Sequence, residues 1–133
     1  MAYIIEFKTA KFDPAKEPPN PINAIAGQSV LVWLREVALP AATEPDHEDW
    51  GWYIEVQIEG AGYLVGSICY EPEEGSSSGP ERDWLIQIHK NRSLIDKLLG
   101  RNKLQGDDPL IQKVVAALRV DSLFRDIQET ADA

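Results

Sequence analysis

The chain has only one cysteine and no long apolar run among its 133 residues. The single Cys69 cannot form an internal disulfide, which favours a reducing compartment. Its apolar stretches fall well short of the roughly 18 residues that span a bilayer, so no membrane partner is expected. No cationic start followed by an apolar stretch precedes Glu6, which argues against a secretion signal. These absences predict a cytoplasmic protein.

Signatures of phosphate binding are also missing, because neither GxGxxG nor GxxxxGK[ST] occurs in the chain. The chain holds 13 Lys and Arg residues against 22 Asp and Glu residues, a net charge of −9. Proteins gain most of their affinity for nucleic acid by replacing its counterions with cationic side chains. We therefore expect no nucleic-acid partner, and no cofactor.

Apolar periodicity gives the expected secondary structure. Alternating residues predict strands over 3–8, 50–59, 63–70 and 83–89, and spacings of three and four predict helices over 28–39, 94–99 and 108–118. A last helix is expected to begin near Asp121. We expect one α+β domain over residues 1–133, with an antiparallel sheet of three to four strands, helices packed on one face and the order β-α-β-β-β-α-α.

Strand register is the least determined part of this prediction. A turn at 60–62 with two loop residues would pair Val56 with Val65, and a turn with three would pair Val56 with Gly66. A loop centred near residues 76 and 77 places Cys69 opposite Trp84 and leaves His89 five positions away. At about 3.3 Å per residue that separation approaches 17 Å, which excludes a Cys69–His89 dyad.

Charge is strongly segregated along the chain. Residues 44–83 hold eleven carboxylates and one cation, a net of −10, whereas the preceding segment sums to zero and the following one to +1. Clustered like charge steers an oppositely charged partner during association. We therefore expect a non-enzymatic protein-interaction domain that binds or inhibits a basic partner protein, as immunity and antitoxin proteins do.

This interpretation requires the anionic side chains to gather into one patch. Trp50 is expected on the same side of its strand as Trp52, first in that apolar row, and joins the anionic residues because it borders them; Trp33, Trp52 and Trp84 are expected in the core. The residues expected to contact the partner are Glu44, Asp46, Glu48, Asp49, Trp50, Glu71, Glu73 and Glu74.

Two alternatives stay open. The run Asp46-His47-Glu48-Asp49 has the ligand types of a metal-dependent hydrolase, but its spacing fits neither a calcium loop nor HExxH, so no metal ligand is assigned. A structural subunit of a homo-oligomer would show an exposed apolar patch on the C-terminal helices. The sequence leaves the partner, any catalytic activity and the oligomeric state undetermined.

A basic run over residues 90–103 opposes the acidic segment. Acidic residues reduce the positive charge of this run. The connector that follows it is also too long for the tight turn of a helix-turn-helix. We expect it to pair with the acidic segment or to be solvated. Its cations are Lys90, Arg92, Lys97, Arg101 and Lys103.

Overall fold

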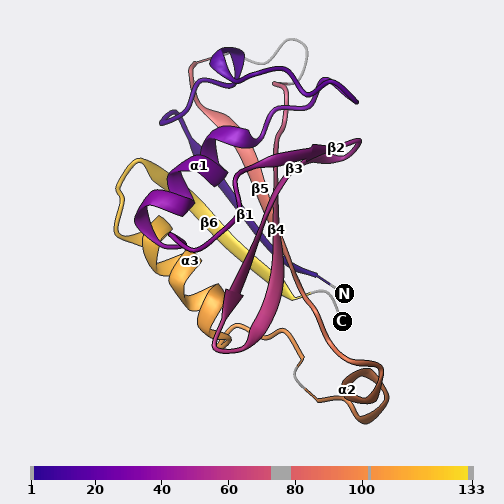
Figure 1. The fold of residues 1–133 in the computed structure, drawn as a ribbon. Coiled ribbons are helices and arrows are strands. Elements are labelled where there is room, and N and C mark those ends of the chain that lie inside the picture. The colour runs from indigo at the N-terminus through magenta and orange to yellow at the C-terminus, as the bar shows by residue number, and fades with distance from the viewer. Residues whose placement is uncertain (1, 73–78, 102, 132–133) are drawn as a thin grey trace.

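A computed structural model describes residues 2–72, 79–101 and 103–131. Six antiparallel strands form one sheet in the order β2-β3-β4-β5-β1-β6 (Figure 1). The strands are β1 (Tyr3–Thr9), β2 (Asp46–Glu48), β3 (Gly51–Ile58), β4 (Ala61–Cys69), β5 (Arg82–Lys90) and β6 (Phe124–Ala131). The helices are the 3-10 turn η1 (Pro14–Lys16), α1 (Gln28–Val37), α2 (Leu94–Leu99) and α3 (Pro109–Arg119).

The sequence-based prediction of three to four strands is wrong, because the sheet has six. Strand β2 lies in the segment expected to be an acidic linker, and β6 replaces the helix expected near Asp121. The order β-α-β-β-β-α-α is wrong for the same reason, since β2 and β6 are missing from it. The α+β class holds, with helices and an antiparallel sheet in one chain.

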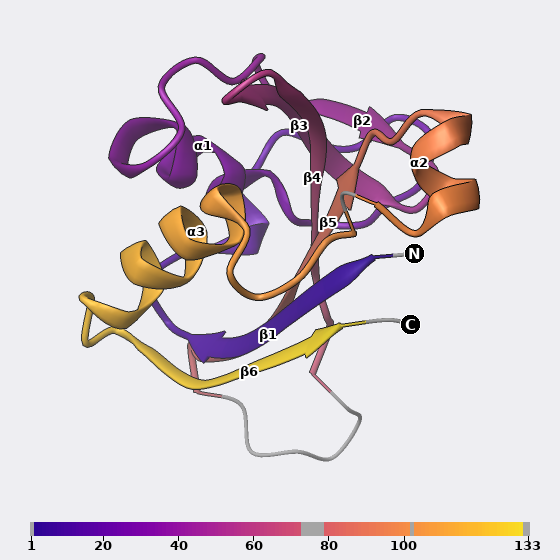
Figure 2. The same ribbon diagram turned by 90° about the horizontal axis from the view of Figure 1, so that it is seen from below.

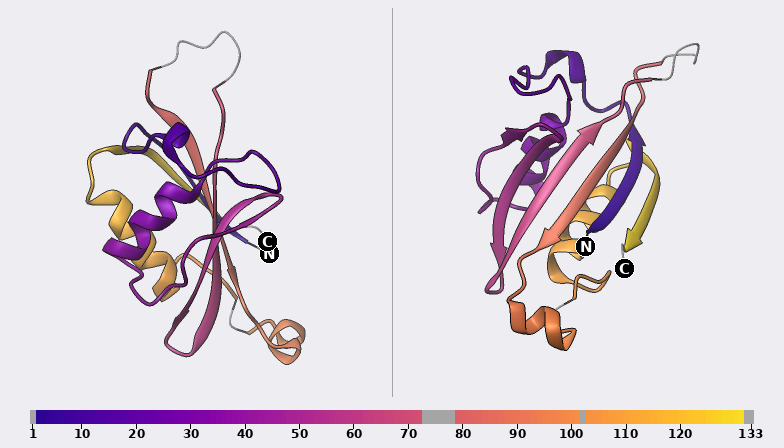
Figure 3. Two further views of the ribbon diagram at one scale, coloured as in Figure 1. Left: turned by 45° about the horizontal axis from the view of Figure 1, so that its top comes forward. Right: turned by 90° about the vertical axis from the view of Figure 1, so that its right-hand side faces the viewer.

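Two helices cover one face of the sheet, as Figures 2 and 3 show. α1 and α3 lie side by side there, with their apolar stripes against the strands. Each leucine or isoleucine buried in this layer contributes about 1.5–3 kcal/mol to folding. We call the opposite face, which neither α1 nor α3 covers, the open face. Completely buried side chains of the helix-covered core include Ile5, Leu31, Leu34, Ile54, Ile86 and Leu110.

The hairpin between β3 and β4 turns at Glu59 and Gly60, one residue earlier than either sequence-based alternative. Both residues have positive φ angles, 51° and 82°, as a two-residue hairpin turn of type I′ requires. Val56 consequently pairs with Tyr63, not with Val65 or Gly66. The register between β4 and β5 is the expected one, since Cys69 pairs with Trp84 and Leu64 with His89.

The Pro-rich connector between β1 and α1 folds back over one end of the sheet (Figure 1). The carboxylate of Glu17 accepts hydrogen bonds from the backbone N–H groups of Gly27, Gln28 and Ser29, at 2.9, 2.8 and 3.1 Å, and from the Ser29 hydroxyl. Three of these donors are N–H groups at the start of α1 that have no partner within the helix. The connector therefore supplies the cap of the helix that follows it.

Each border of the sheet departs from a regular strand. β2 spans three residues and ends in the turn that leads to β3. In β6 the pairing with β1 shifts between Glu6 and Lys8, and Asp126 has a positive φ of 54°. This combination marks a β-bulge in the border strand.

Candidate functional site

The open face carries a row of half-buried apolar side chains on its central strands. In β1, β4 and β5 these positions alternate with the residues that face α1 and α3. Within the part of the chain that the structure describes, no helix covers the row, as the edge-on view in Figure 3 shows. The row consists of Ile4, Leu64, Ile68 and Leu85.

Three carboxylates gather around a tyrosine at the β2 border of the open face. Tyr53 pairs with Asp46 across the β2–β3 hairpin, and its hydroxyl donates to the Asp46 carboxylate at 3.4 Å. Glu48 and Glu55 stand two residues along the strands from these partners, on the same face. Desolvation and the negative charges of the three carboxylates raise the pKa of the Tyr53 phenol. The arrangement is an exposed anionic border beside an aromatic ring.

Trp50 extends this border over the sheet. Its ring lies so close to Gly66 that a Cβ added there would come within 2.7 Å of two ring carbons. The ring is half-buried, and its centre lies 6.1 Å from that of Tyr53. The alternation of β3 does not extend back to Trp50, because Gly51 between the tryptophans has a φ of 150°. Trp50 therefore lies on the open face, opposite to the core side chain of Trp52.

We name Asp46, Glu48, Trp50, Tyr53 and Glu55 the hairpin cluster. Two asparagines of the Pro-rich connector hold it in place. The buried Asn20 amide donates to the backbone oxygens of Glu48 and Gly51 at 2.9 and 3.1 Å, and Asn23 donates to that of Asp49 at 2.9 Å. Asn20 and Asn23 bind the β2–β3 turn, and β3 is paired with β4 on its other side. The cluster therefore has a fixed geometry.

The remaining residues predicted to contact a partner lie outside this cluster. Glu44 is highly exposed and lies 3.9 Å from the Arg35 guanidinium, and Asp49 is exposed in the β2–β3 turn. Glu71 lines a pocket described below, beyond the end of β4. Glu73 and Glu74 lie outside the described residues.

Besides Glu44, two carboxylates of the acidic segment are paired with cations. Asp83 lies 2.9 Å from the Lys8 ammonium, and Glu81 accepts two hydrogen bonds of 2.6 Å from Arg125. Through these hydrogen bonds Arg125 lowers the pKa of Glu81. The acidic segment therefore divides on the open face into an ion-paired region over β1, β5 and β6 and the hairpin cluster at the β2 border.

The metal-ligand run does not assemble into a site. The His47 ring packs edge-on against the buried Trp52 ring, with centres 5.7 Å apart, while Asp46 and Glu48 face the other way along the strand. Over the described ranges 2–72, 79–101 and 103–131, no three His, Cys, Asp or Glu side chains are placed to bind one metal ion. The metal-dependent hydrolase stays a prediction without an observation that favours it.

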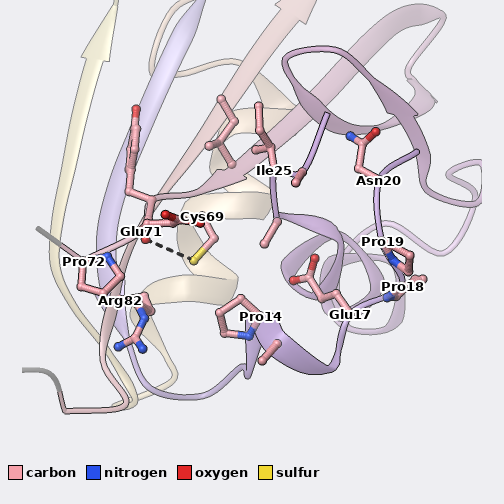
Figure 4. A pocket seen from close by; sticks show the side chains of 15 residues that line it. Pro14, Glu17, Pro18, Pro19, Asn20, Ile25, Cys69, Glu71, Pro72 and Arg82 are labelled. Atoms are coloured by element: carbon pink, nitrogen blue, oxygen red, sulfur yellow. Dashed lines mark hydrogen bonds between the residues drawn. The ribbon is translucent and has the colours of Figure 1, made fainter. Parts of the chain in front are cut away.

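A pocket of about 940 Å³ lies where the Pro-rich connector meets the ends of β4 and β5 (Figure 4). Its potentially reactive groups already have partners, because Glu17 caps α1 and the Cys69 thiol donates to the Tyr70 carbonyl at 3.7 Å. Burial raises the pKa of Cys69 to about 12, so the sulfur stays protonated and is a poor nucleophile at neutral pH. The pocket has the geometry of a binding cleft without an activated group.

Residues 75–79 read Gly-Ser-Ser-Ser-Gly, which fits the Gly-x-Ser-x-Gly pattern of serine hydrolases. In those enzymes the serine stands on a sharp turn between a strand and a helix. Here the segment connects β4 to β5, two adjacent antiparallel strands, and residues 75–78 lie outside the described part of the chain. The pattern therefore lacks the strand-to-helix connection that marks a nucleophilic serine in those enzymes.

Comparison of the chain with protein-family models, with curated proteins and with solved structures finds no match. The site is thus defined by its geometry. Tyr53 and Glu55 belong to it although neither was among the predicted contact residues. The signal for both was present in the sequence, since alternation along residues 50–59 places them on the solvent side of the strand.

Proposed function

We propose that this chain is a non-enzymatic protein-interaction domain that binds a basic partner protein through the open face. The observation that carries the proposal is the hairpin cluster, three carboxylates around an aromatic pair on the face that neither α1 nor α3 covers. Arginine and lysine side chains bind such a border through both charge-assisted hydrogen bonds and contact with aromatic rings. The half-buried apolar row beside the cluster supplies the centre of the interface, and the charged border forms its rim.

Inhibition follows from the same contact when the partner is an enzyme with a cationic substrate site. An acidic domain that occupies that site excludes an anionic substrate by charge and by volume. The rigid attachment of the cluster by Asn20 and Asn23 supports this role, because a preorganised surface loses less entropy on binding.

The first prediction concerns the association rate. Changing Glu48→Gln and Glu55→Gln together removes two charges from the cluster, and we expect the association rate with the basic partner at low salt to fall by about threefold or more. The partner is recovered on immobilised wild-type chain at low salt and released at high salt, and its binding is then followed by surface plasmon resonance.

The matched control is the double variant Glu36→Gln with Asp107→Asn, which has the same net charge but changes two exposed carboxylates away from the cluster. We expect a near-normal association rate for this control. Equal losses in both double variants would mean that total charge governs binding and would contradict a local contact. A partner whose association is indifferent to salt would contradict the proposal as well.

A further inference from the structure

The helix α2 exposes its apolar side chains to solvent, unlike α1 and α3. The exposed fractions of Leu94, Ile95, Leu98 and Leu99 are 73%, 59%, 76% and 65%. The last three follow Leu94 by one, four and five residues, which places all four along one side of the helix. An apolar cluster of this size on the surface of a small protein marks a contact site. We call these four residues the apolar tip.

The tip is held in a defined conformation. Ser93 caps the start of α2 by accepting from the Asp96 N–H at 3.0 Å, and Gly100 ends the helix in the left-handed conformation with φ 66°. The Arg92 guanidinium donates to the backbone oxygens of Arg101 and Asp96 at 3.0 and 3.1 Å, which ties the two ends of α2 together. The exposed side chains thus stand on a closed structural unit.

The position of α2 relates it to the open face. The helix follows β5 and lies beyond the end of the sheet, displaced away from α1 and α3 toward the open face (Figures 2 and 3). The hairpin cluster lies toward the opposite end, because β3 begins beside it and runs antiparallel to β4. Two copies placed open face to open face, with their strands reversed, would bring each tip toward the cluster of the other copy.

Charge is complementary in this arrangement. The segment 90–103 around the tip holds five cations and one carboxylate, and it stays net positive although Lys90 is paired with Asp108 and Arg101 with Asp96; the hairpin cluster holds three carboxylates. Contact between two tips would instead bring cations together. An anionic bilayer is also a poor occupant, because its surface repels a chain of net charge −9 within about a Debye length.

We propose that two copies of this chain form a twofold dimer in which the apolar tip of each packs on the open face of the other, beside its hairpin cluster. The contact is isologous and closes on itself, so it yields a dimer and not a filament. This inference rests on the proposed function in one respect only, that both use the open face. The basic partner and the second copy then compete for the same surface.

The second prediction tests the dimer by sedimentation velocity over a concentration series. We expect the wild-type chain to dimerise, and Leu98→Gln to raise the dissociation constant by about tenfold or more, because a central anchor side chain is lost. The matched control is Leu123→Gln, which alters an exposed leucine outside the tip and leaves the dimer intact. A wild-type chain that stays monomeric throughout the series overturns the proposal, as does equal weakening by both variants.

A charge exchange identifies the two contact surfaces. Lys97→Glu and Glu48→Lys each weaken the dimer, and the chain carrying both changes recovers most of the wild-type affinity because the charges are reversed together. A double variant no better than either single change overturns the pairing of tip with cluster. Binding of a monomeric chain to anionic phosphatidylserine vesicles that is lost with Leu98→Gln would assign the tip to membranes and overturn the dimer.

The outcomes separate the two proposals. Leu98→Gln weakens the dimer but leaves capture of a basic partner at least as strong as in the wild type, since α2 is not part of that contact. Failure of the dimer with normal capture removes only the present inference. A normal dimer with no salt-sensitive capture removes only the proposed function.

Discussion

Asp108 connects three elements of the chain through one nearly buried carboxylate. It accepts hydrogen bonds from the Tyr63 hydroxyl at 2.8 and 3.0 Å, from the Lys90 ammonium at 2.9 Å and from the Leu110 N–H at 3.0 Å. The Lys90 side chain is only 14% exposed, and its ammonium forms an ion pair with this carboxylate. A single residue therefore caps α3 and neutralises the cation at the end of β5.

The third prediction concerns this network. Asp108→Ala removes the cap and leaves Lys90 without its counter-charge, so we expect the free energy of unfolding to fall by about 3–5 kcal/mol. Urea denaturation followed by circular dichroism measures the change. The neighbouring exposed residue provides the control, and Asp107→Ala is expected to stay within about 0.5 kcal/mol of the wild type. Similar losses for both variants would show that the network contributes little.

Gly66 is the residue that admits the Trp50 ring to the open face. In the fourth prediction, Gly66→Ala forces this ring away, because the added Cβ would lie 2.7 Å from two of its carbons. We expect weaker capture of the basic partner, by about threefold, with net charge unchanged. Surface plasmon resonance measures the capture and near-ultraviolet circular dichroism the ring environment.

The control for this variant is Gly79→Ala, because a Cβ added at Gly79 meets no atom within 4 Å. It should bind like the wild type. Capture that is unchanged by Gly66→Ala, although the tryptophan signal moves, would remove the aromatic pair from the contact and leave only its carboxylates.

At the scale of elements, the segments with strong local signals were predicted well. α2 begins after the Ser93 cap and ends before Gly100, and α3 begins at Pro109 after the Asp108 cap, as the sequence indicates. The central strands β3, β4 and β5 also follow their alternation, to within two residues at each end. Local chemistry is sufficient for these elements because caps, turns and periodicity agree.

The two border strands could not be predicted from local sequence. β2 is only three residues long, and two of the three are carboxylates, so it has neither apolar alternation nor β-forming composition. In β6 only Phe124 is buried, so its pairing depends on β1, more than a hundred residues earlier. Their strand conformation comes from tertiary pairing, which overrides propensity and is invisible to a short window.

The same reason explains how much of the candidate site could be predicted. Composition identified the acidic segment, and Asp46, Glu48 and Trp50 were among its named residues. Their grouping with Tyr53 depends on the pairing of β2 with β3, and the separation of Glu81 and Asp83 depends on Arg125 and Lys8. The predicted single anionic patch is therefore divided, because cations from distant parts of the sequence pair with some of its carboxylates.

At the scale of the whole molecule, the buried groups Tyr3, Tyr63 and Cys69 hold their protons more tightly in the folded state. Burial and the Glu129 hydrogen bond raise the pKa of Tyr3 to about 12, and burial is the main cause that raises the pKa of Cys69 to about 12. Burial and the Asp108 hydrogen bond raise the pKa of Tyr63 as well. Each group is neutral when protonated, so the folded state resists its ionisation.

The fifth prediction follows from the sign of these shifts. Above the ordinary pKa values of 9.0 for cysteine and 10.0 for tyrosine, the unfolded chain releases protons that the folded chain keeps. The stability that these protonated groups contribute is therefore fully present below about pH 9, and it declines as the pH rises toward about 12. Thermal unfolding by circular dichroism should show the melting temperature falling by several degrees over this range.

Tyr3→Phe removes one of these ionisations, and its melting temperature should fall less steeply above about pH 10 than that of the wild type. Parallel curves for the two proteins would show that Tyr3 does not contribute to the alkaline transition. A melting temperature that does not change up to about pH 11 would contradict the assignment for all three groups.

The irregular borders of the sheet have a consequence for the chain in crowded solution. An exposed strand offers unpaired backbone groups to any other extended chain and can template aggregation. Here one margin is a three-residue strand that carries the carboxylates of Asp46 and Glu48. The other margin is irregular at Asp126, and several of its side chains are charged. These features disfavour in-register pairing with another strand, and with it growth of the sheet into amyloid-like ribbons.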